Sequence, residues 1–236
     1  MTSSRRQPPI VHDRHLNDLT ALIAQYGGAA WMLDDPVGST TARELRGLYP
    51  GTVSPSGVTF GQPGPVLGGD LKAAAGLNGA GDISSTYFPS GAFTFLGWWK
   101  SELTTATRPV FSFRDDVWAG GYSFNFFDTG RALLCLGQSN FRYWNLSFAA
   151  NAWYFLAVTI PGGDINSIQA SAAYINGSPL TTYSTTATGA ANVRIKFNLA
   201  RLFTERLNGQ IGPTAIIPAA LSANDIFALY MGATGG

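Results

Sequence analysis

The sequence predicts an all-β fold, and three observations support this class. Charged residues make up only 12% of the 236 residues, about half the usual share of ~25%. Aromatic residues reach 13%, and 28 glycines and 13 prolines suit short strands joined by tight turns. Many short segments have strand character and do not alternate with helices, so we expect a sandwich or barrel of antiparallel strands with a buried core.

The first twelve residues are predicted to form an extended arm. Pro8 and Pro9 prevent a helix at their own positions and disfavour one just upstream. The arm carries Arg5 and Arg6 and contains no acidic residue. We expect these four residues to contact a neighbouring molecule, because a polar arm of this kind has little reason to pack on its own domain.

A helix is predicted at 13–26. Asp13 can cap its N-terminus and Gly27 can end it. Its apolar residues recur at helical spacing on one face, namely Leu16, Leu19, Leu22, Ile23 and Tyr26. The expected organisation is an arm at 1–12, a helix and connection at 13–28, and a β domain at 29–236.

From Ala29 onward the pattern is that of strands separated by turns. The predicted strands are 29–34, 58–61, 70–76, 82–87, 92–100, 108–114, 120–127, 131–136, 141–148, 153–160, 167–175, 193–200 and 208–217. Glycine-rich and proline-rich segments predict turns at several places, among them 61–64 and Asn176-Gly177. A last helix is predicted at 222–230, with Ser222 as N-cap and Asp225 completing a capping box.

Two predicted strands are apolar on both faces. Both alternating sets of side chains in 93–100 and 153–160 contain large apolar residues, which is typical of central strands whose outer face is covered. One explanation is that the N-terminal helix or a loop lies over that face; the other is that the face holds a ligand. Between the sheets we expect Phe93, Phe95, Trp99, Phe155 and Ala157, or their strand neighbours.

Five segments resemble, in order, the motifs of laminin-G-like, concanavalin A-like domains. Residues 30–35 with 38–39 resemble the opening "YWRLDE-SG", 92–100 resembles "SFTLSAWVK", and 151–159 resembles the strand "W-H-V-A-V-T". Residues 173–177 resemble "LYVNG", and 207–212 with 220–226 and 229–230 resemble the closing "F-G-I-DEV…LS-EI-LY". The resemblance spans residues 29–232 and implies a jelly-roll sandwich of two antiparallel sheets with one concave face.

The chain departs from this family's pattern in two ways. Gly212-Pro213-Thr214 stands where the closing strand usually carries acidic residues. Many family members hold calcium through acidic loops, but no segment here has the spacing of a dedicated calcium loop, so no metal is expected. If calcium binds nevertheless, the first candidates are Asp82, Asp115, Asp116 and Asp128.

Catalysis is not expected. Glycan cleavage needs two carboxyl groups facing one bond, and the glycanases of this fold carry an E-x-D-x-x-E strand. The three glutamates, Glu44, Glu102 and Glu205, lie in no such strand, and no aspartates alternate in one. Both histidines, His12 and His15, precede the β domain, so a serine or Cys135 lacks a nearby base within it.

The charge balance excludes two further classes of partner. The net charge is +1, from 15 basic and 14 acidic residues, so a nucleic-acid footprint is absent. The sequence contains no run of 18 apolar residues, so a membrane span is not expected. The N-terminus lacks the apolar segment of a secretory signal. Cys135 lies in an apolar run and is interpreted as a buried thiol.

Carbohydrate binding is the remaining ligand hypothesis. A sugar ring needs an aromatic platform and polar partners for its hydroxyls. The candidates are Trp118 at a strand end, the adjacent Tyr143 and Trp144, of which one must face away from the core, and Trp98 if its outer face is open. For Trp118 the alternative is a hydrophobic plug under a hairpin.

Laminin-G-like domains preceded by a short helix recur in bacteriophage minor tail, fibre and decoration proteins. The resemblance therefore implies a non-enzymatic virion protein that is assembled in the host cytoplasm, with other virion proteins or copies of itself as partners and host glycans as a further contact. The alternative is a lectin-like carbohydrate-binding module. A glycan hydrolase or lyase is the third hypothesis, and it lacks its residues.

Overall fold

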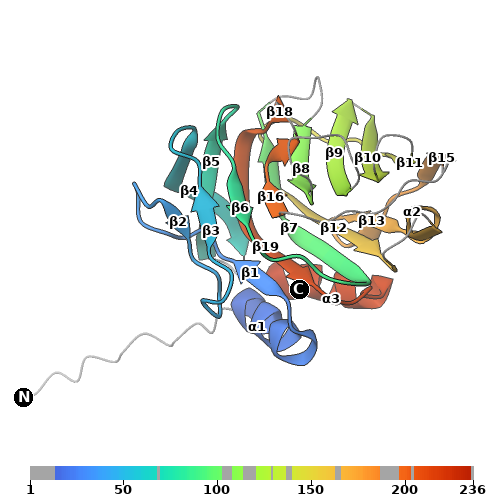
Figure 1. The fold of residues 1–236 in the computed structure, drawn as a ribbon, viewed down its shortest axis with the longest axis horizontal. Coiled ribbons are helices and arrows are strands. Elements are labelled where there is room, and N and C mark those ends of the chain that lie inside the picture. The colour runs from blue at the N-terminus through green and yellow to red at the C-terminus, as the bar shows by residue number, and fades with distance from the viewer. Residues whose placement is uncertain are drawn as a thin grey trace, which may run out of the picture.

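Two antiparallel sheets packed face to face form the body of the protein (Figure 1). The structure is a computed structural model. It describes residues 14–67, 70–102, 108–113, 121–128, 130–136, 140–162, 166–186, 197–202 and 205–234. The arrangement confirms the predicted all-β jelly-roll sandwich.

The first sheet has eight strands in the order β14-β13-β12-β7-β19-β5-β4, and β1 also pairs with β19. All of its strand pairs are antiparallel. The order places strands that are far apart in the sequence side by side, such as β5 and β19. The strands are β1 (Ala29–Trp31), β4 (Val58–Leu67), β5 (Asp70–Asn78), β7 (Phe93–Ser101), β12 (Tyr154–Ile160), β13 (Ala172–Ile175), β14 (Ser178–Pro179) and β19 (Asn208–Ile217).

The second sheet has nine strands in the order β15-β11-β10-β9-β8-β16-β6-β3-β2. A separate two-stranded ribbon joins β17 (Arg201–Leu202) to β18 (Glu205–Arg206). The nine strands are β2 (Thr41–Ala42), β3 (Gly51–Val53), β6 (Ile83–Ser85), β8 (Arg108–Ser112), β9 (Tyr122–Asp128), β10 (Arg131–Leu136), β11 (Asn140–Asn145), β15 (Thr182–Thr186) and β16 (Phe197–Leu199).

Both predicted helices are present. Helix α1 spans Arg14–Tyr26 and helix α3 spans Ala223–Thr234, where Asp225 accepts hydrogen bonds from the backbone N and the hydroxyl of Ser222 at 3.0 and 2.7 Å. The predicted strand 167–175 is wrong in its first half, because Asn166–Ala170 forms the short helix α2 and only Ala172–Ile175 forms a strand. None of the described helices is long and apolar enough to cross a membrane.

Aromatic side chains fill the space between the sheets. Trp99 from the first sheet meets Phe126 from the second with ring centroids 4.0 Å apart, and Phe95 stacks on Phe111 at 4.3 Å. Fully burying one such side chain stabilises the fold by about 1.5–3 kcal/mol, so this layer dominates the core. The expected core positions Phe93, Phe95 and Trp99 are confirmed.

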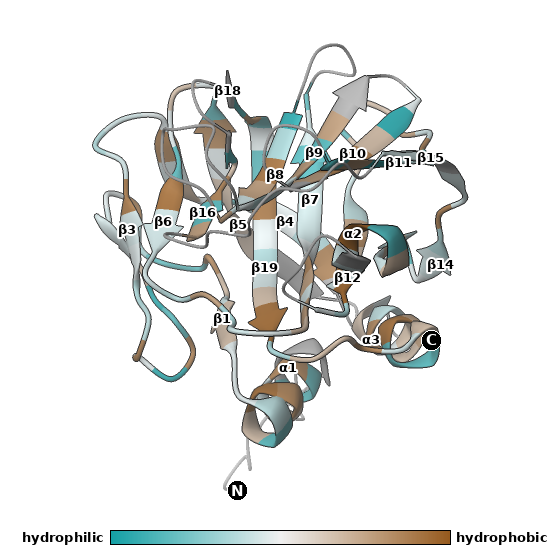
Figure 2. Ribbon diagram, turned by 45° about the vertical axis from the view of Figure 1, so that its right-hand side comes forward, coloured by the Kyte–Doolittle hydropathy of each residue, from teal (hydrophilic) through white to brown (hydrophobic). Residues whose placement is uncertain are grey.

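A second apolar cluster lies on the outer face of the eight-stranded sheet. There α1 and α3 lie side by side below the sandwich, and the apolar end of β19 points toward α1 (Figures 1 and 2). Phe155 and Ala157 belong to this outer cluster rather than to the inter-sheet core, because Phe155 pairs with Trp98 across the β12–β7 ladder. Leu19 of α1 is fully buried against the same face, so the covered-face interpretation is confirmed.

Two glycine-containing segments show how local chemistry set the pairing. Asn176 and Gly177 both have positive φ, 49° and 75°, which joins β13 to β14 by the predicted tight turn. The predicted turn at 61–64 is wrong: these residues continue β4, and the pairing with β5 is interrupted by bulges on both sides of Gln62-Pro63. Proline is tolerated there because β4 is an edge strand.

The departure from the family pattern in β19 also has a structural explanation. The pairing of β19 with β7 shifts between Ile211 and Thr214, so Gly212 and Pro213 occupy a bulge. A Cβ at Gly212 would lie 3.0 Å from Pro65 and 3.1 Å from Trp98. The glycine therefore lets β4 and β7 approach this strand closely.

Candidate functional site

A polar groove of about 290 Å³ crosses the part of the eight-stranded sheet's outer face that the helices leave open. We call it the amide groove, because side-chain amides from three adjacent strands line it. Its residues are Gly57, Thr59, Gln62, Gly76, Leu77, Asn78, Glu102, Asn208, Gly209 and Gln210.

Strand register brings these residues together. Gln210 pairs with Gly76 on one side and with Lys100 on the other, and Asn208 pairs with Asn78. Residues directly opposite one another project from the same face of a sheet. Because the adjacent Ile211 points into the inter-sheet core, Gln210 and its partners face outward.

At least one side-chain amide of the groove has an oxygen without a hydrogen-bond partner. The side-chain oxygen Oε1 of Gln210 is buried and has no hydrogen-bond partner in the structure. A buried polar atom of this kind is satisfied in nearly all proteins, by protein, water or ligand. In contrast, Asn78 is partly used by its own loop, since its Oδ1 accepts from the N–H of Ala80 at 3.1 Å.

Glycine keeps the floor of the groove open. Gly76 lies between Thr59 and Gln210 in the ladder, and a Cβ there would lie 3.0 Å from the Gln62 side chain and 3.6 Å from the backbone oxygen of Thr59. Gly209 has a different reason to be glycine, because a Cβ would lie 2.1 Å from the backbone oxygen of Lys100. Gly76 is thus the position where a side chain can be added to obstruct the groove.

An aromatic residue stands beside the groove. Lys100, the ladder partner of Gln210, places its Nζ 5.4 Å from the ring centroid of Trp153. Both side chains are half-buried. The ammonium group occupies one face of the ring through a cation–π contact. Neither side chain lines the groove itself.

Two of the predicted aromatic platforms are buried in the structure. Trp98 is 5% exposed, because it lies in the outer cluster with ring centroids 5.5 Å from Phe155 and 6.3 Å from Tyr230 of α3. Trp144 is 1% exposed and belongs to the inter-sheet core. Neither ring can present a free face to a sugar.

Tyr143 lies elsewhere, on the outer face of the nine-stranded sheet. It is half-buried, pairs with Leu133 and lies under the guanidinium of Arg131, 5.6 Å from the ring centroid. Strand β10 separates Tyr143 from β9, where the side chains of Ser123 and Asn125 are buried on that outer face without hydrogen-bond partners. Among the described aromatic candidates, Tyr143 is therefore the one with an accessible side chain. It lies on a different sheet from the amide groove.

The remaining predicted contacts lie outside the described residues. These are Trp118 and the arm residues Arg5, Arg6, Pro8 and Pro9. Their roles stay predictions.

One of the calcium candidates has another partner. Asp82 forms an ion pair with Arg201, with Nη1 and Oδ2 3.3 Å apart and both side chains largely buried. Asp115 and Asp116 lie outside the described residues, as does the side chain of Asp128. Within the described ranges, no three histidine, cysteine, aspartate or glutamate side chains gather as a metal site would need.

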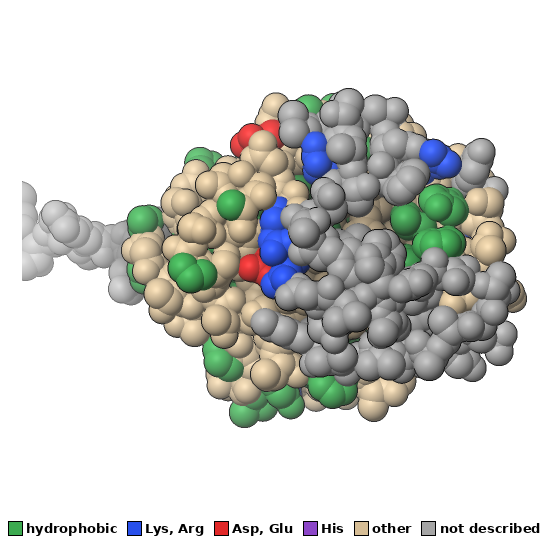
Figure 3. Space-filling model, turned by 45° about the horizontal axis from the view of Figure 1, so that its top comes forward, with side chains coloured by type: hydrophobic (Ala, Val, Ile, Leu, Met, Phe, Trp, Pro, Cys, Tyr) green, Lys and Arg blue, Asp and Glu red, His purple; other side chains and the backbone are tan. Residues whose placement is uncertain are grey.

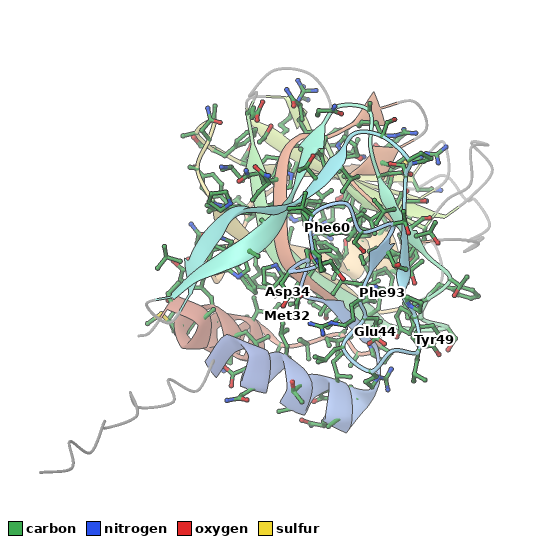
Figure 4. All side chains as sticks on the ribbon, turned by 90° about the vertical axis from the view of Figure 1, so that its left-hand side faces the viewer. Met32, Asp34, Glu44, Tyr49, Phe60 and Phe93 are labelled. Carbon is green, nitrogen blue, oxygen red and sulfur yellow. The ribbon has the colours of Figure 1, made fainter. Side chains whose placement is uncertain are left out.

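Glu44 has a structural role. It is 1% exposed, and its carboxylate accepts hydrogen bonds from the backbone N–H groups of Ala30, Leu48 and Tyr49 at 3.0–3.4 Å. Figure 4 shows it beside Tyr49 on the side of the molecule near α1. Since backbone donors occupy both oxygens, Glu44 holds the loop after β2 rather than facing a substrate.

Sequence reasoning missed the amide groove because its residues are ordinary in isolation. The asparagines and glutamines are dispersed from residue 62 to residue 210 and match no motif. Only the register of β4, β5 and β19 places them side by side. The alternation of Asn208 and Gln210 at the start of the predicted strand 208–217 was the one available signal.

Comparisons with known proteins agree on the fold. Domain 4 of AbnA, an extracellular arabinanase from Geobacillus stearothermophilus, was solved in complex with arabinotriose and is similar with a TM-score of 0.64 at 18% identity, over 86% of this chain and 97% of that one. Trypanosoma rangeli sialidase is similar with a TM-score of 0.62 at 13% identity, over 86% of this chain and 32% of the sialidase. The receptor binding domain of botulinum neurotoxin type G is similar with a TM-score of 0.58 at 15% identity, over 87% of this chain and 50% of that one.

Sequence comparison assigns the family. A search of curated proteins found no match. The model of the family Laminin_G_3, described as the concanavalin A-like lectin/glucanases superfamily, matches residues 75–227, which is more than half of the chain. The match includes the predicted motifs at 92–100, 151–159 and 173–177. The chain therefore belongs to the concanavalin A-like lectin/glucanases superfamily.

Proposed function

We propose that this chain is a non-enzymatic jelly-roll module that binds neutral saccharides in the amide groove. The observation that carries the proposal is the juxtaposition of four side-chain amides, Gln62, Asn78, Asn208 and Gln210, in one groove with a buried and unpartnered Oε1. An amide both donates and accepts hydrogen bonds, as a sugar hydroxyl does, so the two match without a change of protonation.

The charge of the groove favours uncharged ligands. Glu102 is its one charged lining residue and is exposed to solvent. A carboxylate there opposes the approach of an acidic sugar. On the face shown in Figure 3, the described charged side chains form a few separate groups among neutral atoms.

The similar proteins give the proposal context. One of them, the arabinanase domain, was solved with the neutral saccharide arabinotriose. Cell entry of botulinum neurotoxin type C, whose structure is also similar, depends on interaction with two ganglioside molecules. Saccharide binding in this chain is therefore consistent with what these relatives of its fold do.

Titration with saccharides tests the groove. Arabinotriose and a panel of neutral oligosaccharides are titrated into isotopically labelled protein, and amide shift changes are followed by NMR. We expect changes centred on β5 and β19, and about tenfold weaker binding for Asn208→Ala/Gln210→Ala, since each lost hydrogen bond contributes about 0.5–1.5 kcal/mol. Gly76→Leu should block the groove.

The matched control is Asn145→Ala, which removes an exposed amide at the end of β11 on the other sheet. It should bind like the parent. Binding that persists in both groove variants but is lost on Tyr143→Ala would move the site to the nine-stranded sheet. No binding to any saccharide of the panel would reject the proposal.

We further propose that the module is a structural component of a bacteriophage virion, at a tail tip or on a capsid. This assignment is supported by the resemblance to phage virion proteins in which a short helix precedes such a domain, and by the low charge and single cysteine of the chain. Mass spectrometry of purified particles and a cryo-EM map test it. A chain found free of any particle would instead be a lectin-like module.

A further inference from the structure

A second groove lies between the two helices that cover the outer cluster. It has a volume of about 280 Å³, and we call it the helix groove. Its residues are Asp18, Ala21, Leu22 and Gln25 of α1 and Asp225, Ala228 and Leu229 of α3. Two leucines and two alanines supply its apolar lining, and each helix contributes one carboxylate.

The helix groove is acidic and incompletely occupied. The side chain of Asp18 makes no hydrogen bond or ion pair within the described residues, and the carboxylate of Asp225 accepts hydrogen bonds only at Oδ2, to cap its own helix. Leu22, which also lines the groove, is half-buried. The groove therefore suits a segment that combines cationic and apolar side chains.

The arm of this chain has that chemistry. Residues 1–12 carry Arg5 and Arg6 and no acid, followed by the apolar run Pro8-Pro9-Ile10-Val11. The lining of α1 from Asp18 to Gln25 is about 10 Å long at 1.5 Å per residue. Four residues in the polyproline conformation span about 9–12 Å, so the run from Pro8 to Val11 matches that length.

We infer that the helix groove binds the arm of a second copy of the chain, with Arg5 and Arg6 facing Asp18 and Asp225. A copy's own arm is poorly placed to do so. Only His12 and Asp13 separate Val11 from Arg14, where α1 begins, and Asp18 follows one turn later. An arm that filled its own groove would have to reverse direction within those two residues. The inference is independent of saccharide binding, which uses a different surface.

Sedimentation velocity of the full-length protein tests the inference. The parent should self-associate, and Asp18→Lys and Arg5→Glu/Arg6→Glu should each weaken self-association at least about tenfold through like-charge repulsion. Deletion of 1–12 should do the same. Asp34→Lys, which changes the net charge equally but is not a groove residue, should associate like the parent.

Mixing the two charge variants separates a second copy from the chain's own arm. An equimolar mixture of Asp18→Lys protein with Arg5→Glu/Arg6→Glu protein pairs opposite charges only between unlike copies. Association restored by mixing supports arm exchange. A parent that is monomeric at all concentrations, association that Asp18→Lys does not weaken, or a mixture that stays monomeric would overturn it. Circular dichroism and melting curves confirm that each variant is folded.

Discussion

At the scale of single residues, burial separates the roles of chemically similar aromatic side chains. Trp98 and Trp99 are sequence neighbours, yet one packs under α3 and the other between the sheets, because neighbouring residues on a strand face opposite sides. Tyr143 and Trp144 divide in the same way, with Trp144 in the core. A residue's role in this sandwich follows from the face it occupies.

Trp99 should be among the most costly residues to truncate. It is 1% exposed and packs between Phe126 and Phe148, with ring centroids 4.0 and 5.3 Å away. Trp99→Ala should lower the free energy of unfolding by about 3–5 kcal/mol in denaturant titrations. Trp99→Phe should lose less, because it leaves a smaller cavity. A Trp99→Ala variant that melts like the parent would show that this position is not core.

Tyr87 should make stability depend on alkaline pH. Burial, together with nearby Tyr49, raises the pKa of Tyr87 to about 12 in the folded protein, against ~10 in an unfolded chain. Its contribution to stability is complete below pH 10 and is lost as the pH rises from about 10 to 12, because the unfolded chain releases its proton first.

Melting temperatures measured from pH 8 to 12 check this expectation. The parent should lose stability above pH 10, and Tyr87→Phe should lose less over the same interval. Burial also raises the pKa of Tyr174, so some loss of stability above pH 10 should remain in the Tyr87→Phe variant. A Tyr87→Phe profile that parallels the parent throughout would contradict the assignment.

At the scale of elements, the two terminal helices act as a cover for one sheet. Leu19 and Ile23 of α1 are 0% and 3% exposed, and Ile226 of α3 is fully buried beside them. No residue of either helix lines the amide groove, which lies on the same outer face. The helices thereby decide where a ligand can reach this sheet.

Truncation should distinguish the helix from the arm. Leu19→Ala should lower the free energy of unfolding by about 2–5 kcal/mol, the range for a buried leucine. Deletion of 1–12 should leave the melting temperature of dilute protein nearly unchanged, because Leu19 and the rest of α1 remain. Asn17→Ala, at an exposed position of the same helix, is the control. If deletion of 1–12 unfolded much of the protein while the molecules that stay folded assembled normally, the arm would belong to the domain's own packing.

At the scale of the whole molecule, the protein combines a large apolar core with a nearly neutral surface. The net charge is +1 and charged residues are 12% of the chain, so polar contacts depend on amides and hydroxyls. Such a surface recognises neutral polar ligands and other protein surfaces better than it recognises polyanions.

Purified protein should not hydrolyse common polysaccharides. Glu44 is used by backbone donors, and Glu102 is the one carboxylate that lines the amide groove, whereas glycan cleavage generally needs two. Reducing-sugar assays with long incubation check this. Reproducible cleavage that disappears in Asp115→Asn or Asp116→Asn protein would reverse the expectation and place an active site at these aspartates.

The sequence by itself determined the fold class and most elements, because those depend on local patterns. The period-2 alternation, the tight turn at Asn176-Gly177 and the helical spacing in 13–26 each act over a few residues, and the structure contains the corresponding strands, turn and helix. Local patterns failed where tertiary context overrode them, as at Gln62-Pro63, which the edge position of β4 accommodates within a strand.

Only the tertiary structure decided which residues share a surface. Shifting a strand's register by one residue exchanges its two faces, so the sequence could not say that Phe155 joins Trp98 outside the sandwich while Leu156 lies inside. The amide groove depends on the same long-range pairing, because it joins β4 and β5 to a strand more than a hundred residues later. Local propensity sets what each segment becomes, whereas packing between distant segments sets which side chains meet.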